Sequence, residues 1–269
     1  MTQAQIQQQP VIEVNGLVTH YGERRILNDV SLTIQHGEIM VIMGGSGSGK
    51  STLLRPMMAL ATATSGSIKL LGHELSELSQ ADFYNLCRKI GVSFQSGALF
   101  SSMTVGENII LPLREHTNLD QTTMNIMARL KLEVVDLAGF ENLMPSELSG
   151  GMVKRAALAR AIIMDPALLF CDEPSAGLDP VVSSALDELI LRLRSAMRMT
   201  IVVVTHELDS AFKIADRITV LDQGEILTIG TVDEVRNSSN ERIQNLLNRR
   251  FEAEEVDPDE YLARLMGQT

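Results

Sequence analysis

Short apolar runs of four to six residues recur along the chain, with segments of helical character between them. They are apolar at consecutive positions, which is typical of strands buried on both faces of a parallel sheet. We predict five such strands, at residues 38–43, 89–94, 167–171, 200–205 and 218–221. The pattern therefore predicts an α/β fold around a largely parallel sheet.

Two regions depart from this pattern. Near the N-terminus, residues 12–18, 30–34 and 68–71 are punctuated by turn residues such as Asn15-Gly16 and Gly37, which favours antiparallel strands. Between about residues 99 and 163 the strand signals vanish and a helical spacing takes over, as in Met124, Met127, Leu130, Val134 and Val135. We expect an antiparallel β subdomain and a helical insertion in the core.

The C-terminal segment, residues 241–269, has an amphipathic pattern. Ile243, Leu246, Leu247 and Phe251 fall near helical spacing, and Asp257-Pro258 resembles a helix start. An apolar stripe of this size needs cover, either from its own domain or from a partner. The pattern leaves both interpretations open.

Composition narrows the class of protein. The chain has 269 residues, 45% apolar and 21% charged, which suits one large globular domain. Its net charge of -11 argues against a protein that mainly grips nucleic-acid phosphates. Cys87 and Cys171 lack metal-ligand or disulfide spacing, so a reducing cytosol is expected. The sequence shows no secretory signal and no run of about 18 apolar residues, so the chain is not expected to cross a membrane by itself.

Residues 44–52 read GGSGSGKST and lie between the apolar run IMVIM and a helical segment. They match the phosphate-binding pattern GxxxxGK[ST] in the strand–loop–helix context that it requires. In such a loop the backbone N–H groups and the helix N-terminus surround a polyphosphate. Lys50 is expected to reach the β/γ-phosphate oxygens, and Ser51 to offer its hydroxyl to Mg²⁺. The predicted phosphate ligands are Gly44, Gly45, Ser46, Gly47, Ser48, Gly49, Lys50, Ser51 and Thr52.

A second candidate element is ALLFCDE at residues 167–173, a strand that ends in two carboxylates. Side chains alternate along a strand, so Asp172 and Glu173 are expected to point in different directions. We assign Asp172 to the Mg²⁺ shell and Glu173 to the attacking water, as its base. An acidic pair alone usually marks a solvated strand end, and the phosphate-binding loop upstream favours the functional interpretation.

The sequence LSGGM at residues 148–152 precedes the helical segment VKRAALARAII. Ser149, Gly150 and Gly151 at a helix start can form a second anion cradle. Here the chain resembles the ABC transporter ATPases, whose LSGG signature stands just upstream of the Walker B strand. Because Lys50 already serves one cradle, two cradles per chain imply a head-to-tail homodimer that buries two ATP molecules.

The resemblance extends over about residues 11–235 and implies further site residues. Gln95 matches the Q-loop glutamine that contacts Mg²⁺ and the attacking water, and Asp179 ends a D-loop match at residues 175–179. His206 matches the switch histidine that hydrogen-bonds the γ-phosphate, and Tyr21 resembles the aromatic residue that stacks on adenine. Two positions depart from the family pattern: Gly45 replaces a common proline, and Met152 replaces the glutamine after LSGG.

The resemblance also implies the fold and the domain limits. It predicts a P-loop NTPase of the ABC nucleotide-binding type, with a RecA-like core, an antiparallel β subdomain and a helical subdomain at about residues 98–163. The ATPase domain is expected at residues 11–240, with the amphipathic tail at 241–269. ATP hydrolysis with Mg²⁺ follows as the expected activity.

Residues 94–117 and the segment MPSELSGGM look like the MlaF branch of this family, the ATPases of bacterial phospholipid transport between inner and outer membranes. The branch implies two ATPase copies beneath MlaE-type permeases, a ring of MlaD-type MCE proteins and an MlaB-type STAS protein. The chain would be peripheral, on the cytoplasmic face of the inner membrane, and would not bind nucleic acid.

Three alternatives carry different expectations. An ABC importer ATPase for amino acids or another solute would have the same motifs and a different permease. An ABC protein acting on ribosomes or DNA should have two cassettes, a coiled-coil insertion or a basic face, which the acidic balance disfavours. A non-hydrolysing module would lack the carboxylate Glu173 and His206.

Overall fold

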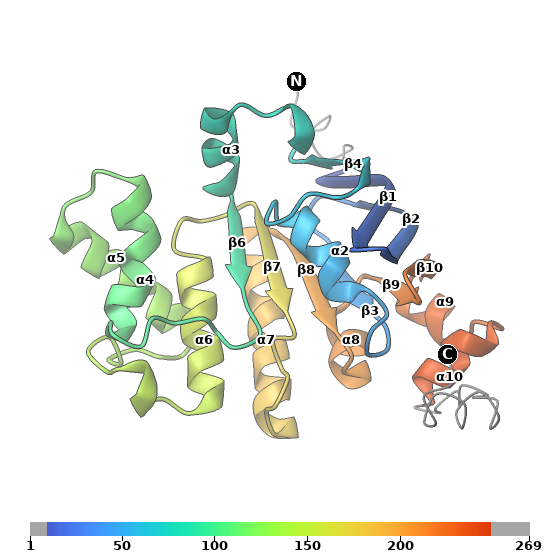
Figure 1. Ribbon diagram of the computed structural model, residues 1–269. Helices are drawn as coiled ribbons and strands as arrows, with labels where there is room; N and C mark the ends of the chain where they lie inside the picture. The colour runs from blue at the N-terminus through green and yellow to red at the C-terminus, as the bar shows by residue number, and fades with distance from the viewer. Residues whose placement is uncertain (1–9, 249–269) are drawn as a thin grey trace, which may run out of the picture.

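The computed structural model describes residues 10–248 and has the predicted α/β fold (Figure 1). A six-stranded sheet with the order β10-β9-β3-β8-β7-β6 forms its centre. Neighbouring strands from β9 to β6 run parallel, and β10 is antiparallel to β9. The strands are β3 (Ile39–Met43), β6 (Ile90–Ser93), β7 (Leu168–Asp172), β8 (Thr200–Thr205), β9 (Arg217–Asp222) and β10 (Glu225–Gly230).

All five predicted strands of this sheet are confirmed, and β10 is an addition. The apolar pattern did not predict β10, because several of its side chains are only half-buried and Thr228 interrupts the apolar run. It follows β9 through a tight turn in which Gly224 has a φ of 80°. A Cβ at Gly224 would lie 2.1 Å from the Ile26 carbonyl oxygen, so this turn accepts only glycine.

The consecutive apolar residues of the sheet face two separate cores. In β3, Val41 and Met43 pack with the helices on one face, while Met40 and Ile42 pack toward the antiparallel strands on the other. Phe170 of β7 is fully buried in the second core. Burial of one such side chain stabilises the fold by roughly 1.5–3 kcal/mol. Burial on both faces explains why these strands lack polar alternation.

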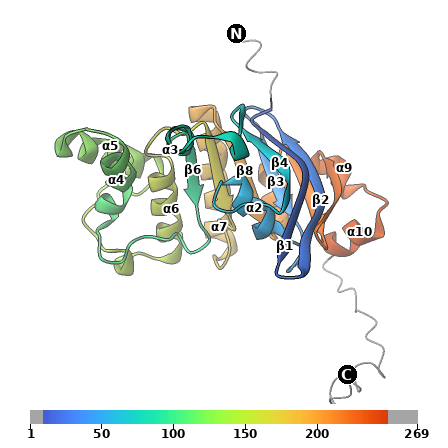
Figure 2. The same cartoon turned by 45° about the horizontal axis from the view of Figure 1, so that its top comes forward.

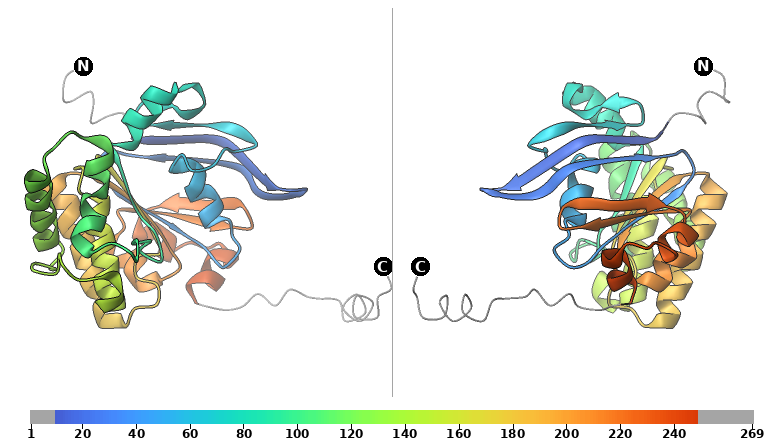
Figure 3. Two further views of the ribbon diagram at one scale, coloured as in Figure 1. Left: turned by 60° about the vertical axis from the view of Figure 1, so that its left-hand side comes forward. Right: turned by 90° about the vertical axis from the view of Figure 1, so that its right-hand side faces the viewer.

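The antiparallel subdomain is a four-stranded sheet with the order β2-β1-β4-β5. Its strands are β1 (Ile12–Tyr21), β2 (Arg24–Ile34), β4 (Ser65–Leu70) and β5 (His73–Glu74). Figure 3 shows β1 and β2 running as a long ribbon above β9 and β10. The predicted antiparallel strands are present. β2 begins at Arg24 and not at residue 30 as predicted, because its first residues, Arg24 and Arg25, are polar and gave no strand signal.

The helices of the predicted helical insertion lie at the opposite end of the molecule from β1 and β2 (Figure 2). They are α4 (Val105–His116), α5 (Gln121–Val134) and α6 (Gly150–Ala161), with a short 3₁₀ turn, η2 (Pro145–Glu147). On α5 the buried face consists of Met124, Ala128 and Leu132, spaced by four residues. Leu130 and Val134, which the predicted stripe included, are exposed. The apolar pattern of α5 has two stripes, and the sequence does not show which one is buried.

The remaining helices of the described residues lie outside this helical segment. They are α2 (Lys50–Met57), α3 (Gln80–Cys87), α7 (Pro180–Met197), α8 (Leu208–Ile214), α9 (Val232–Arg236) and α10 (Glu241–Leu247), with a 3₁₀ turn, η1 (Leu75–Glu77). Within residues 10–248, no helix is long and apolar enough to cross a membrane.

The first part of the C-terminal segment packs on its own domain. Ile243 of α10 is 1% exposed and belongs to the core cluster that includes Val235 and the helical face of the sheet. Leu246 and Leu247 are partly buried against the same cluster. Phe251 and the helix start predicted at Asp257-Pro258 lie outside the described residues. A partner contact by those residues stays a prediction.

Candidate active site

The loop that follows β3 enters α2 with the backbone geometry that its glycines permit. Gly47 and Gly49 have φ angles of 77° and 104°, in the region that favours glycine. Position 44 requires glycine for a different reason: a Cβ there would lie 2.1 Å from the Leu221 carbonyl oxygen. The Lys50 ammonium folds back over this loop and donates to the Gly44 and Gly45 carbonyls at 2.8 and 2.9 Å.

This loop, the acidic strand end and the histidine meet because of sheet order. β3, β8 and β7 are neighbours and parallel, with Met43 opposite Thr205, and Val204 opposite Asp172. Residues 44–49, Glu173 and His206 directly follow these three carboxyl ends. Ligand sites of open α/β sheets lie at that edge. Three motifs from distant parts of the sequence therefore share one site.

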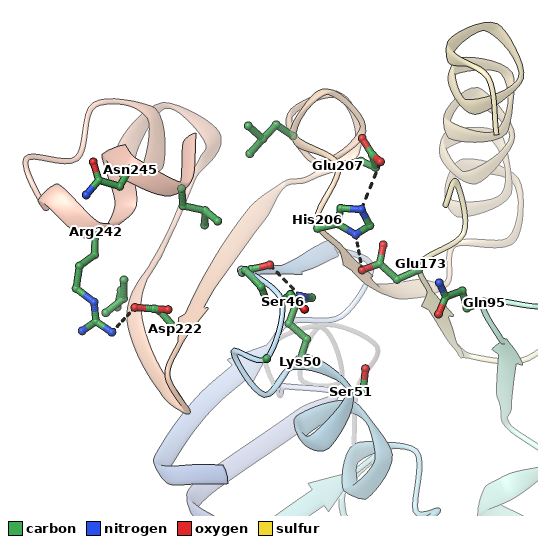
Figure 4. Close-up of a pocket in the computed structure, with 16 residues that line it drawn as sticks. Ser46, Lys50, Ser51, Gln95, Glu173, His206, Glu207, Asp222, Arg242 and Asn245 are labelled. Carbon is green, nitrogen blue, oxygen red and sulfur yellow. Dashed lines mark hydrogen bonds and ion pairs between the residues drawn. The ribbon is translucent and has the colours of Figure 1, made fainter. Parts of the chain in front are cut away.

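An open cavity of about 990 Å³ occupies this edge (Figure 4). Its lining includes Gly44, Gly45, Ser46, Gly47, Lys50, Ser51, Gln95, Glu173 and His206, all of which the sequence predicted. Figure 4 shows Glu173 between His206 and Gln95, with Lys50 facing them across the cavity. The structure brings these residues together around a space that can receive a triphosphate.

The two carboxylates have different surroundings. Glu173 is 8% exposed, and its Oε1 accepts a hydrogen bond from the His206 Nδ1 at 2.9 Å. His206 Nε2 lies 3.5 Å from Glu207 Oε1, so the imidazole sits between two carboxylates. Asp172 Oδ1 and Glu173 Oε2 are buried without a hydrogen-bond partner among residues 10–248. Buried acceptors of this kind need a donor or a cation.

Burial and charge shift the titration of the groups around the cavity. Burial raises the pKa of Asp172 above its usual value, and the neighbouring Glu173 charge adds to the rise. Burial lowers the pKa of Lys50, and the carboxylates Glu173 and Asp172 partly offset this effect. The site therefore holds a negative pair opposite a partly desolvated cation, which is common at functional sites.

Tyr21 lies on the outer side of the phosphate loop. It lines a second, smaller cavity of about 280 Å³ with Arg24, Ile26 and residues 47–52. Ser48 and Thr52, which complete the predicted phosphate loop, line this cavity and are themselves largely buried. The Tyr21 side chain is 55% exposed, so its ring is free to meet a flat ligand. The two cavities share Gly47, Lys50 and Ser51 in their linings, so both border the same loop.

The predicted second cradle does not line either cavity. Ser149 caps α6 and accepts from the Met152 N–H at 3.3 Å, while Asp179 caps α7 and accepts from Val181 and Val182. These two helix starts are packed together, since a Cβ at Gly151 would lie 2.6 Å from Val182 Cγ1. A Cβ at Gly150 would meet only Leu178, at 3.6 Å. The structure thus groups Ser149, Gly150, Gly151 and Asp179 away from the phosphate loop of the same chain.

Sequence reasoning missed several residues of the site. One wall of the large cavity comes from α10 and the end of β9, where Arg242 forms an ion pair with Asp222. On the other side, Lys154 of α6 is 7% exposed and donates to the Glu173 carbonyl at 3.1 Å. The sequence does not distinguish a buried lysine in a helix from an exposed one. The position of Lys154 just after the LSGG signature was the one available sign that it could belong to the site.

Comparison with known proteins decides the family. Residues 27–176, more than half of the chain, match the family model for the ABC transporter. The chain belongs to the ABC transporter family. It is an ATP-binding, ATP-hydrolysing cassette of that family, as the sequence motifs predicted.

Relatives within the ABC family narrow the assignment. The intermembrane phospholipid transport system ATP-binding protein MlaF of Escherichia coli is 40% identical over 227 residues, which covers 84% of each chain. The probable ribonucleotide transport ATP-binding protein mkl of Mycobacterium tuberculosis is 40% identical over 239 residues, which covers 89% of this chain and 67% of that one. The predicted resemblance to the MlaF branch is confirmed.

A solved ABC cassette has the same fold. The dimeric structure of MJ0796, a bacterial ABC transporter cassette, aligns with a TM-score of 0.76 at 31% identity. The alignment covers 82% of this chain and 98% of that one. The predicted fold class, a P-loop cassette of the ABC type, is confirmed.

Proposed function

We propose that this ABC ATPase drives phospholipid transport between the inner and outer membranes of a bacterium, as part of a complex of the Mla type. The observation that carries the proposal is the 40% identity to the E. coli MlaF protein over 84% of both chains. The mkl relative is as similar, but this chain spans only 67% of it. Transport of a polar solute, such as a ribonucleotide or an amino acid, is the second candidate.

The proposed assembly follows the same branch. Two copies of the chain would lie on the cytoplasmic face of the inner membrane beneath MlaE-type permeases. An MlaD-type MCE ring and an MlaB-type STAS protein would complete the complex. Within the chain, residues 11–240 would form the ATPase domain, with a helical subdomain at about 98–163 and a tail at 241–269.

The residues of the large cavity suit the phosphates of ATP. Loop 44–49 would surround them with backbone N–H groups, and Lys50 would leave the carbonyls of Gly44 and Gly45 for the β- and γ-phosphates. Tyr21, which lines the smaller cavity on the same loop, would stack on adenine. The smaller cavity would then receive the base and the larger one the phosphates.

Residues in and beside the large cavity fit a magnesium ion. Asp172 Oδ1 is a buried oxygen without a partner among residues 10–248, and hydroxyl and amide oxygens of Ser51 and Gln95 come from the neighbouring cavity wall. No group of three or more His, Cys, Asp or Glu side chains suited to a metal occurs in that range. Mg²⁺ needs few protein carboxylates, because phosphates and water supply the rest. Bound there, it would neutralise charge on the phosphates.

Hydrolysis then depends on the Glu173 and His206 pair. The Glu173 carboxylate would accept a proton from the water that attacks the γ-phosphorus, while Gln95 orients that water. His206, now bonded to Glu173 Oε1, would donate a hydrogen bond to the γ-phosphate. Glu173 is 8% exposed, so little water competes for its carboxylate, whereas the His206 side chain is 55% exposed and lines the open cavity.

The remaining predicted ligands would act on a second copy. Ser149, Gly150 and Gly151 at the start of α6, with Asp179 beside them, do not line the cavity of their own chain. In a head-to-tail homodimer each group would close the nucleotide site of the other subunit, and the two ATP molecules would lie between them. An isolated subunit should therefore be a poor ATPase.

Affinity purification of the full chain from its native membrane tests the transport assignment. We expect a permease of the phospholipid type, MCE and STAS proteins, and bound phospholipid to copurify, as identified by mass spectrometry. A solute permease with a soluble binding protein would instead support the second candidate. Copurification with ribosomes or nucleic acid would overturn both.

The composite site has its own test in Glu173→Gln. This variant removes the proposed base while retaining the side-chain volume, so ATP should bind without turnover and hold two subunits together. We expect ATP-dependent dimers by light scattering and a loss of ATPase activity of about 100-fold or more. Lys50→Ala in the same variant, which removes a phosphate ligand, should abolish the dimers. Monomers in saturating ATP would contradict the shared site.

A further inference from the structure

Helix α6 holds the loop after β6 through two basic side chains that its sequence pattern did not reveal. Lys154 donates to the Gln95 carbonyl, and Arg160 donates to the Gly97 and Ala98 carbonyls at 2.8 and 2.7 Å. The packing is equally close, because a Cβ at Gly97 would lie 2.8 Å from Val153 Cγ1. The backbone at residues 95–98 is thus attached to α6 at three carbonyls.

The same lysine reaches the backbone of Glu173. Its Nζ lies 3.1 Å from the Glu173 carbonyl oxygen, so one ammonium group bridges Gln95 and Glu173. Lysine is seldom buried without a specific partner, and at 7% exposure Lys154 uses carbonyl oxygens as partners. A single side chain therefore joins the backbones of two proposed active-site residues.

Glu173 needs such support because its backbone is strained. Its φ is 47°, a left-handed conformation that costs a residue with a side chain free energy unless its surroundings hold it. The Glu173 N–H donates to the Val204 carbonyl at 2.8 Å, which fixes the N-terminal side of the residue. On the other side, the carbonyl accepts from Lys154 and from the Ala176 N–H at 3.2 Å. Loss of the lysine would leave this carbonyl with the longer of the two bonds.

We propose that Lys154 is a positioning residue for ATP hydrolysis, which holds the Glu173 carboxylate and the Gln95 side chain in register with helix α6. The inference rests on the proposed function, in which Glu173 is the base and Gln95 orients the water. The inference adds a physical link, because Ser149, which caps α6, belongs to the cradle proposed for the other subunit's nucleotide. One rigid helix then connects the signature of one site with the catalytic groups of the other.

The test compares variants of α6 in the complete complex purified from membranes. Lys154→Met has a similar length but no donor, and we expect its kcat to fall by about 10- to 100-fold, the effect of a misplaced reacting group. The dissociation constant for ATP should stay within about threefold, because no phosphate ligand of the chain's own cavity changes. Lys154→Arg restores a donor and should recover a large part of kcat.

Two matched controls separate positioning from general loosening of α6. Arg155→Met removes the neighbouring cation, whose hydrogen bonds within residues 10–248 go to Val135 and Asp136, and should leave kcat within about twofold. Arg160→Met loosens residues 97–98 without touching Glu173, and its loss of kcat should be smaller than that of Lys154→Met.

The outcomes separate this inference from the proposed function. Full kcat in Lys154→Met, or equal losses in all three methionine variants, would overturn the positioning role while Glu173→Gln still abolishes turnover. Normal turnover in Glu173→Gln would instead refute the proposed base. Lys154→Met could lower the melting temperature sharply, and the Lys154→Arg variant then tests the role. If Lys154→Arg is folded but its kcat is no higher than that of Lys154→Met, the positioning role is contradicted.

Discussion

At the scale of single residues, the phosphate loop depends on space as well as on backbone flexibility. Gly44 has no room for a Cβ, because Leu221 and Ser48 oxygens would lie 2.1 and 2.6 Å from it. A Cβ at Gly45, the next residue, would meet no atom within 4 Å. Lack of space therefore explains the glycine at position 44 and does not explain the one at position 45.

We expect Gly44→Ala to weaken ATP binding by about tenfold or more, because the loop must shift away from Leu221 to relieve the contact. Gly45→Ala is the matched variant and should change the affinity by no more than about threefold. Titration with a fluorescent ATP analogue measures both dissociation constants. Equal affinities for the two variants would show that the close approach of Gly44 does not shape the loop.

A second prediction concerns Asp187, buried between α7 and α8, where Ser210 donates to its Oδ2 at 3.0 Å. Burial raises the pKa of Asp187, and the Ser210 hydrogen bond and Lys213 only partly offset it. The folded protein thus binds this proton more tightly than the unfolded chain does. The charged carboxylate costs stability that grows as the pH rises through the interval from the unfolded pKa to the folded one.

Asp187→Asn removes that cost and retains an acceptor for Ser210. We expect the variant to melt at a higher temperature than the unchanged protein at pH 7, with the difference vanishing below about pH 4, where the unfolded carboxyl is also protonated. Thermal unfolding between about pH 3.5 and 8 measures the difference. A variant that is less stable at pH 7 would mean that the ionised carboxylate contributes favourable contacts.

At the scale of elements, several helices begin with a side chain that accepts from the first turn. Thr104 and Glu107 form a reciprocal capping box at α4, and Ser149 caps α6 in the same general way. Such a cap stabilises a helix by about 1 kcal/mol. Of these two caps, Ser149 alone also belongs to the proposed cradle.

This difference allows a matched comparison between Ser149→Ala and Thr104→Ala. Both should lower the free energy of unfolding by about 1 kcal/mol. Ser149→Ala should also lower ATPase activity by about tenfold, because its hydroxyl would face the other subunit's γ-phosphate. Chemical denaturation and steady-state ATPase measurements give the two quantities. Equal ATPase rates in the two variants would contradict the cradle.

At the scale of the whole molecule, α10 links the C-terminal segment to the large cavity. Ile243 is buried in the main core, while Arg242, Asn245 and Leu246 line the cavity. The described part of the segment therefore packs on its own domain.

Ile243→Ala tests that placement. Removal of a buried isoleucine should lower the free energy of unfolding by about 2–4 kcal/mol. Ile126→Ala makes the same chemical change on α5, where the side chain is 53% exposed, and should change stability by less than about 0.5 kcal/mol. Urea unfolding of both variants supplies the comparison. Similar stabilities would indicate that α10 does not pack on its own domain in solution.

The sequence by itself determined those parts of the protein that consist of consecutive residues. The phosphate loop at 44–52, the acidic strand end at Asp172 and Glu173, and the LSGG segment each carry their geometry in a few neighbouring positions. The buried strands were equally clear, because burial on both faces leaves an uninterrupted apolar run. Sheet order then brings Gln95, Glu173 and His206 to the phosphate loop, as the family pattern implied.

The tertiary structure alone decided contacts between residues far apart in the chain. Lys154 reaches Gln95 and Glu173 from 59 and 19 positions away, and Arg242 reaches Asp222 from 20. It also selected the buried stripe of α5, leaving Leu130 and Val134 exposed. Local periodicity shows that a helix has an apolar face or a cation, but packing against other elements determines what that face or cation meets. Which face of a helix is buried, and which partner a cation meets, depend on the free energy of the whole fold. A short segment of sequence does not determine that free energy.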